Sequence, residues 1–68
     1  MLTHDRALTE ARRFVLPLRP VGNGYGFDHF NPDTKVWVRA EEASADYSVA
    51  SRVRFEHLQR MVRYVQAA

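Results

Sequence analysis

The chain contains no cysteine, and glycine, proline and lysine are scarce. Its 68 residues include three glycines, three prolines and a single lysine. Without cysteine, neither a disulfide nor a thiolate-ligated zinc ion can stabilise the fold. No apolar run approaches the ~18 residues of a membrane-spanning helix, and the first residues lack the pattern of a signal peptide. We therefore expect a cytoplasmic protein with no membrane contact.

The short length limits the hydrophobic core. A chain of this size buries only about 60% of the surface that its unfolded form exposes. The core of such a chain supplies roughly 3–5 kcal/mol of net stability. We expect one small domain over residues 1–68, and association with a second copy or with a larger partner would bury further surface. A self-associating structural subunit, such as a homodimer, is therefore one of three functional hypotheses.

The charged residues are distributed unevenly along the chain. The net charge is +2, and nine of the ten basic residues are arginine. Residues 1–27 and 47–68 are basic, with net charges of +2 and +3, whereas residues 28–46 are acidic, with a net charge of −3. Proteins that bind nucleic acid usually gather their basic residues into one stripe. The charge pattern by itself leaves the class of partner open.

The N-terminal segment has the pattern of an amphipathic helix. Thr3 is a suitable N-cap, and apolar residues then recur at helical spacing. These signals predict a helix over about residues 3–14. Pro17 and Pro20 bar its continuation, because proline lacks the N–H group that a helix interior requires. We expect residues 15–20 to be extended, as in an edge strand.

A β-hairpin is the strongest local signal. All three glycines lie between Gly22 and Gly26, and they lead into strands predicted over residues 25–30 and 35–40. The turn between these strands, residues 31–34, reads Asn-Pro-Asp-Thr, which suits a type I turn. A phosphate-binding loop would require glycines that open into a helix N-terminus, so we interpret the glycines as turn residues.

The hairpin register decides which side chains face solvent. Pairing Asn31 with Thr34 gives a core face of Tyr25, Phe27, His29, Val36, Val38 and Ala40. The outer face then places Asp28 opposite Trp37, Phe30 opposite Lys35 and Gly26 opposite Arg39. A bulged register is the alternative, and it would require the left-handed conformation at Thr34.

The C-terminal part changes its periodicity near residue 54. The alternation over residues 47–53 predicts a third strand, although a helix is left open there. An apolar stripe then predicts a helix over about residues 54–66. The expected fold is α+β: a small antiparallel three-stranded sheet with an N-terminal and a C-terminal helix packed on one face, in the order α-β-β-β-α. A helix-turn-helix over residues 40–66 is the alternative.

No catalytic or metal-binding motif stands out. The three histidines, His4, His29 and His57, are not at the spacing of metal ligands. No serine lies in a nucleophile elbow, and the chain is too short to offer much scaffold for a preorganised pocket. We expect no enzymatic activity, no cofactor and no metal.

The leading hypothesis is a small binding protein that docks on a larger protein or nucleoprotein and modulates or inhibits it. Small bacterial and phage proteins often act in this way. An exposed tryptophan beside arginine is typical of binding hot spots, although a different register would bury Trp37 in the core. The predicted partner-binding residues are Asp28, Phe30, Lys35, Trp37, Arg39, Glu41 and Glu42.

The runner-up is direct nucleic-acid binding by the C-terminal helix. The sequence places Arg52, Arg60 and Arg63 on the outer side of that helix, where they could contact phosphates. Glu56 lies four residues from both Arg52 and Arg60, a spacing that equally suits ion pairs on a solvated helix.

Overall fold

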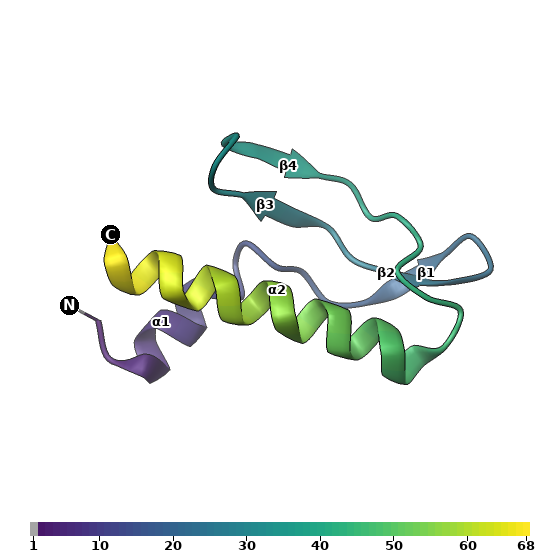
Figure 1. The fold of residues 1–68 in the computed structure, drawn as a ribbon, viewed down its shortest axis with the longest axis horizontal. Helices are drawn as coiled ribbons and strands as arrows, with labels where there is room; N and C mark the ends of the chain where they lie inside the picture. The colour runs from purple at the N-terminus through teal and green to yellow at the C-terminus, as the bar shows by residue number, and fades with distance from the viewer. Residues whose placement is uncertain (1) are drawn as a thin grey trace.

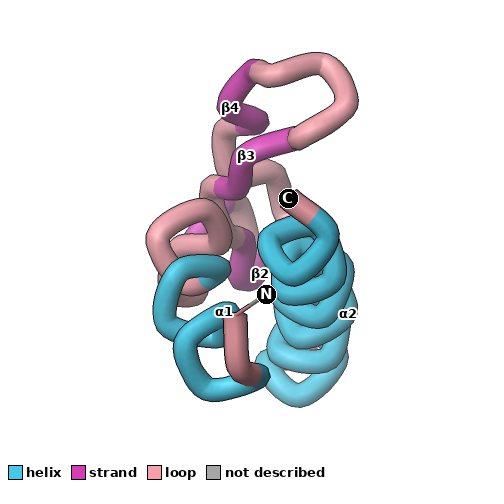
Figure 2. Tube along the Cα trace, turned by 90° about the vertical axis from the view of Figure 1, so that its left-hand side faces the viewer, coloured by secondary structure: helices cyan, strands magenta, loops and turns pink. Residues whose placement is uncertain are grey.

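The protein consists of two helices and two separate antiparallel β-hairpins (Figure 1). A computed structural model describes residues 2–68. The elements in chain order are α1 (His4–Ala11), β1 (Arg19–Val21), β2 (Gly24–Gly26), β3 (His29–Asn31), β4 (Val36–Val38) and α2 (Tyr47–Ala67). The two helices lie side by side, and the β3–β4 hairpin stands above them (Figure 2). The α+β class is confirmed, but the single three-stranded sheet is wrong.

The predicted third strand is the first part of α2. The Asp46 side chain accepts a hydrogen bond from the Val49 N–H at 3.1 Å and so caps the helix. One turn later, Ala50 is completely buried. The N-cap at Asp46 and the burial of Ala50 therefore stabilise a helix over residues 47–53, although their apolar residues alternate as in a strand. Since α2 runs without a break, the helix-turn-helix over residues 40–66 is also wrong.

Helix α1 starts as expected and ends earlier than expected. The Thr3 hydroxyl accepts a hydrogen bond from the Arg6 N–H at 3.3 Å. After Ala11 the backbone tightens, and the Phe14 N–H donates to the Ala11 carbonyl at 2.9 Å. This 3₁₀-type bond terminates the helix before Pro17. Phe14 thereby leaves the helix and enters the extended segment that runs beside β3.

The core is built from small and medium side chains around the contact between the helices. Ala7 and Ala11 of α1 are completely buried in this cluster, and short side chains let backbones approach closely. Ala50, in the first part of α2, is completely buried as well. The Arg54 side chain fixes α2 to the segment that follows α1, because it donates to the carbonyls of Val15 and Leu16 at 3.1 and 2.7 Å. The buried hydrophobic residues are Ala7, Ala11, Val15, Phe27, Ala50, Leu58, Met61 and Val62.

The glycines serve both a turn and a close backbone contact. Gly22 has φ +59°, a conformation that glycine adopts without strain, in the turn between β1 and β2. The Glu42 carboxylate accepts a hydrogen bond from the next residue, Asn23, at 2.8 Å. Gly24 and Gly26 instead lie directly against the backbone of the connection that leads to α2. Their missing side chains allow this connection to cross β2.

The β3–β4 pairing differs from the predicted register by two residues. Asn31 pairs with Val36, Phe30 with Trp37, and His29 with Val38. The loop has four residues, because the Asn31 side chain accepts hydrogen bonds from the N–H groups of residues 33 and 34, and Lys35 then takes φ +60°. A shift of two residues preserves the faces of the strands, so Phe30 and Trp37 still share one face.

Replacing Lys35 with glycine is expected to stabilise the protein by up to about 1 kcal/mol, since glycine adopts positive φ without the penalty that a Cβ atom carries. The free energy of unfolding, measured by urea titration, checks this. Thr34→Gly serves as the control and should give no gain, because Thr34 has no positive φ. A loss of stability in Lys35→Gly would contradict the loop conformation described here.

Candidate interaction surface

Three aromatic side chains form a row across the β3–β4 hairpin and the segment beside it. Val15 bridges to His29, and the Phe30 N–H donates to the Phe14 carbonyl at 2.8 Å. This pairing places Phe14 opposite Phe30, which in turn pairs with Trp37. The ring centroids are 5.5 Å apart for Phe14–Phe30, 5.9 Å apart for Phe30–Trp37 and 6.3 Å apart for Phe14–Trp37, so each ring contacts both of the others. We call Phe14, Phe30 and Trp37 the aromatic row.

The aromatic row is accessible to a partner at its Trp37 end. Side chains alternate between the faces of a strand, so the row lies opposite the face that carries Val15 and His29. The part of that opposite face on β3 and the segment beside it belongs to the core, since Val15 is buried and His29 contacts His57 of α2. The predicted core position of Val36 is wrong, because Val36 lies near the hairpin tip and is 55% exposed. Phe14 and Phe30 are half-buried, whereas Trp37 is 49% exposed.

The outer edge of β4 is open. Phe30 bonds to the Phe14 carbonyl, and Leu16 donates to the Asp28 carbonyl at 2.9 Å, so these β3-side groups point away from β4. Along an antiparallel pair, residue pairs whose backbone groups bond to each other alternate with pairs whose backbone groups point away from each other. Phe30 and Trp37 form a pair of the second kind, so the backbone N–H and carbonyl of Trp37 are directed outward. Within residues 2–68 no other strand pairs with this edge, and β4 lies farthest from α2 (Figure 1).

Two basic side chains, Arg19 and Arg39, lie beside the aromatic row. The acidic residue next to them, Asp28, is already hydrogen-bonded within the protein. Asp28 accepts hydrogen bonds from the Ala40 N–H at 2.6 Å and from the Arg19 guanidinium at 3.4 Å. The Ala40 hydrogen bond, helped by Arg19, holds the pKa of Asp28 below its usual value. An open depression of about 390 Å³ lies here, lined by Leu16, Arg19, Asp28, Trp37, Val38 and Arg39.

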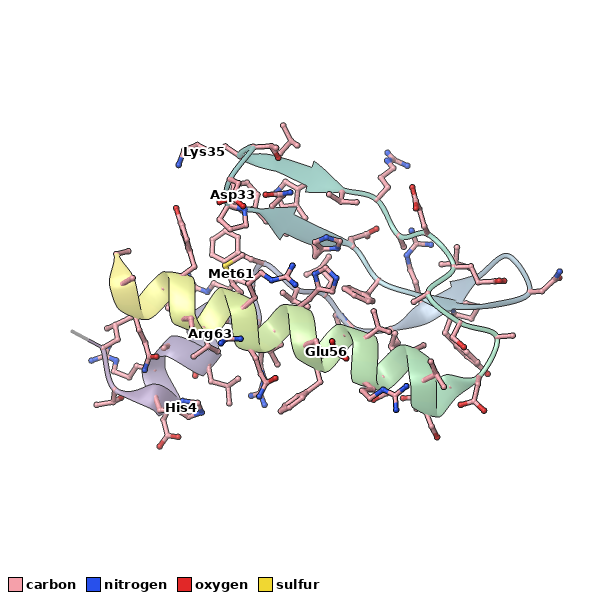
Figure 3. The ribbon with its side chains drawn as sticks, viewed as in Figure 1. His4, Asp33, Lys35, Glu56, Met61 and Arg63 are labelled. Atoms are coloured by element: carbon pink, nitrogen blue, oxygen red, sulfur yellow. The ribbon has the colours of Figure 1, made fainter. Side chains whose placement is uncertain are left out.

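The structure brings together only part of the predicted partner-binding set. Phe30 and Trp37 lie in the aromatic row, and Asp28 and Arg39 line the adjacent depression. The other three residues lie elsewhere. Lys35 is at the tip of the hairpin and points outward (Figure 3), Glu42 holds the β1–β2 turn, and the Glu41 carbonyl lies against Gly26.

Sequence reasoning missed two residues that shape this surface. Phe14 was assigned to the first helix, and nothing in its local sequence indicates pairing with β3. Arg19 lies in the segment over residues 15–20 that the sequence predicts to be extended, and no local pattern indicates its partner. The ion pair between Arg19 and Asp28 spans nine residues and depends on the fold. No short-range pattern could have revealed either role.

The three arginines of the alternative hypothesis lie within an arc of about 80° on α2, but their surroundings differ. Arg52, Arg60 and Arg63 are all exposed. At 100° per residue, Arg63 lies about 20° from Arg52 around α2, but Arg60 lies about 80° away. Arg60 instead lines a cavity beneath the β3–β4 hairpin. In the described part of the chain, no ion pair joins Glu56 to Arg52 or Arg60.

A pair of histidines joins β3 to α2. The rings of His29 and His57 have centroids 4.3 Å apart, and both contact the ring of Phe27. Burial lowers the pKa of each imidazole, and the positive charge of Arg60 lowers both further. The Phe27 carbonyl and the Asp28 carboxylate raise the pKa of His29, and the Glu56 carboxylate raises the pKa of His57. These effects are smaller than the lowering, so both pKa values stay below 6.5. Among residues 2–68, no group forms a hydrogen bond with the buried Nδ1 of His29.

The histidine pair predicts a loss of stability in acid. Because the folded state lowers both pKa values below the ordinary 6.5, the unfolded chain binds more protons in the range just below pH 6.5. The stability of the neutral pair is therefore fully present above about pH 6.5 and is lost as the pH falls below it. Urea titrations at several pH values check this. His57→Phe should flatten the acid-side slope, and an unchanged slope would contradict the assignment.

Two further features bear on what the surface can do. Among residues 2–68, no three His, Cys, Asp or Glu side chains gather in a way that could hold a metal ion. Neither helix in that range is long and apolar enough to cross a membrane. The surface feature that can contact a partner is the aromatic row, together with the open edge of β4 and the basic residues Arg19 and Arg39 beside it. The chain matches no family model, no curated protein and no solved structure, so its function has to be inferred from this surface.

Proposed function

We propose that the protein is a non-catalytic binding protein that docks on a larger protein through the β3–β4 hairpin and thereby modulates or inhibits it. The observation that carries the proposal is the position of Trp37. Its side chain is 49% exposed at the end of the aromatic row, and its backbone lies on an unpaired strand edge. Tryptophan is among the residues that most often dominate binding energy at protein interfaces.

Strand addition is the binding mode that this geometry supports. An extended segment of a partner can pair with the outward N–H and carbonyl of Trp37 and gain main-chain hydrogen bonds. The indole ring of the same residue then contributes apolar contact on the outer face. Backbone and side chain of one residue therefore act together, which makes Trp37 the expected centre of the interface.

The border of the aromatic row favours a partner segment that carries acidic residues. Arg19 and Arg39 line the depression beside Trp37, and the carboxylate of Asp28 is already paired with Arg19. Complementary charge mainly increases the association rate and the specificity rather than the affinity. Most of the binding free energy for the partner is expected to come from apolar contacts with Trp37 and Phe30.

Affinity capture from a cell lysate, with and without nuclease, tests this function. We expect a captured protein that survives nuclease treatment, with binding that weakens only modestly between low and high salt. Purified partner and protein then allow the dissociation constant to be measured for each variant.

Nucleic-acid binding makes the opposite prediction. Capture would be lost on nuclease treatment, and the affinity would fall steeply with salt, with a log–log slope near 0.9 per phosphate contact on duplex DNA. If Arg60→Ala and Arg63→Ala abolish binding while Trp37→Ala leaves it intact, the docking proposal is wrong.

A further inference from the structure

A small cavity lies between the tip of the β3–β4 hairpin and α2. Its volume is about 100 Å³. Its polar lining comes from three elements: His29 and Asn31 of β3, Asp33 of the loop, and His57 and Arg60 of α2. Figure 3 shows Asp33 at the hairpin tip, on the side that faces the part of α2 around Met61.

The cavity gathers groups that carry or can take positive charge. Arg60 is always protonated, and the imidazoles of His29 and His57 lie 4.3 Å apart beside it. One acidic residue, Asp33, lines the cavity, but no acidic side chain forms an ion pair with Arg60 in residues 2–68. Asp28 is paired with Arg19, and in residues 2–68 no ion pair within 4.0 Å joins Asp33 or Glu56 to Arg60.

We propose that this cavity binds a small oxyanion, sulfate-like or carboxylate-like, through His29, His57 and Arg60. Arg60 supplies a permanent charge and a fork of donors that matches an oxyanion. Each imidazole, when protonated, supplies further N–H donors. An anion in the cavity compensates the repulsion among the three groups, so its binding is coupled to proton uptake by the histidines.

The coupling gives a definite pH dependence. A ligand that stabilises the imidazolium forms raises the pKa of the histidines, and by reciprocity a lower pH strengthens binding of that ligand. One proton taken up per anion corresponds to a change in affinity of up to tenfold per pH unit between the pKa of the free state and the higher pKa of the anion-bound state. Binding should therefore be much stronger near pH 6 than near pH 8.

The site shares Phe30 with the aromatic row but can be tested separately from docking. Trp37 does not line the cavity, and the experiment needs no protein partner. Trp37→Ala should therefore leave anion binding unchanged, and failure of one proposal says nothing about the other.

Titration with sodium sulfate, followed by the NMR signals of the histidine rings, tests the proposal. Sulfate keeps its charge across this range, so any pH dependence belongs to the protein. We expect saturable shifts of the His29 and His57 signals, with a dissociation constant at least tenfold lower at about pH 6 than at about pH 8. A parallel titration with sodium acetate distinguishes a doubly charged oxyanion from a carboxylate as the preferred ligand.

Three surface variants sharpen the test. Arg60→Gln should weaken sulfate binding at least tenfold, and Asp33→Asn should strengthen it, because Asp33 is the acidic residue at the cavity. Arg63→Gln, on the same helix but outside the cavity, is the matched control and should have no effect. Equal weakening by Arg60→Gln and Arg63→Gln, or an affinity that does not depend on pH, would overturn the proposal.

Discussion

Replacing Gly24 with alanine is expected to unfold most of the protein. The added Cβ atom would collide with the Ser44 carbonyl oxygen and would lie 2.6 Å from the Ala45 Cα atom. Both are backbone atoms of the connection that pairs with Tyr25, through hydrogen bonds of 2.8 and 2.9 Å, so no side-chain rotation relieves the collision. We expect a loss of at least about 3 kcal/mol, comparable to the whole net stability of a domain this small.

The control for this variant is a substitution at the neighbouring glycine. Gly22→Asn should cost less than about 1 kcal/mol, because asparagine tolerates positive φ better than most residues. Its Cβ atom would lie 3.1 Å from the end of the flexible Glu42 side chain, which can move. Circular dichroism and urea titration measure both variants. Equal stability of Gly24→Ala and Gly22→Asn would show that the connection does not cross β2 as described.

Replacing Trp37 with alanine is expected to abolish most of the partner affinity while leaving the protein folded. The side chain is 49% exposed and lies outside the buried core, but its ring contacts Phe14 and Phe30. The free energy of unfolding should therefore fall by about 1–2 kcal/mol, less than the net stability of the domain. At an interface, truncating a central tryptophan typically costs at least about 2 kcal/mol, or roughly 30-fold in the dissociation constant. Calorimetric titration with the purified partner measures this change.

Phe55→Ala is the matched control for the docking site. Phe55 is 56% exposed and lies on α2, beside a groove between the two helices and away from the aromatic row. The variant removes a similar exposed aromatic surface and should change partner affinity less than about threefold. If Phe55→Ala weakens binding and Trp37→Ala does not, the groove between the helices is the docking site instead.

The sequence predicts which side chains share a face of the hairpin, because this depends only on the alternation of residues along each strand. Side chains alternate strictly along a strand, so an error of two residues in the register left Phe30 and Trp37 on the same outer face. The register itself could not be predicted. It depends on a four-residue loop in which Lys35 takes positive φ, and lysine carries no signal for that conformation.

The rest of the fold depends on contacts between distant segments. The alternation over residues 47–53 favours a strand, and burial of Ala50 decides for the helix instead. Asp46, three residues before Val49, was an available N-cap signal that sequence reasoning did not weigh. The aromatic row depends on Phe14 pairing with Phe30, and the histidine pair on β3 meeting α2. Neither contact has a sequence signature.

The fluorescence of Trp37 tests the central claim most directly, because it is the only tryptophan in the chain. In the free protein, its half-exposed ring should be readily quenched by acrylamide. On titration with the purified partner, the account predicts a blue shift of the emission and a several-fold drop in quenching, saturating at the stoichiometry of binding. Saturated binding with unchanged emission and unchanged quenching would contradict docking through the β3–β4 hairpin.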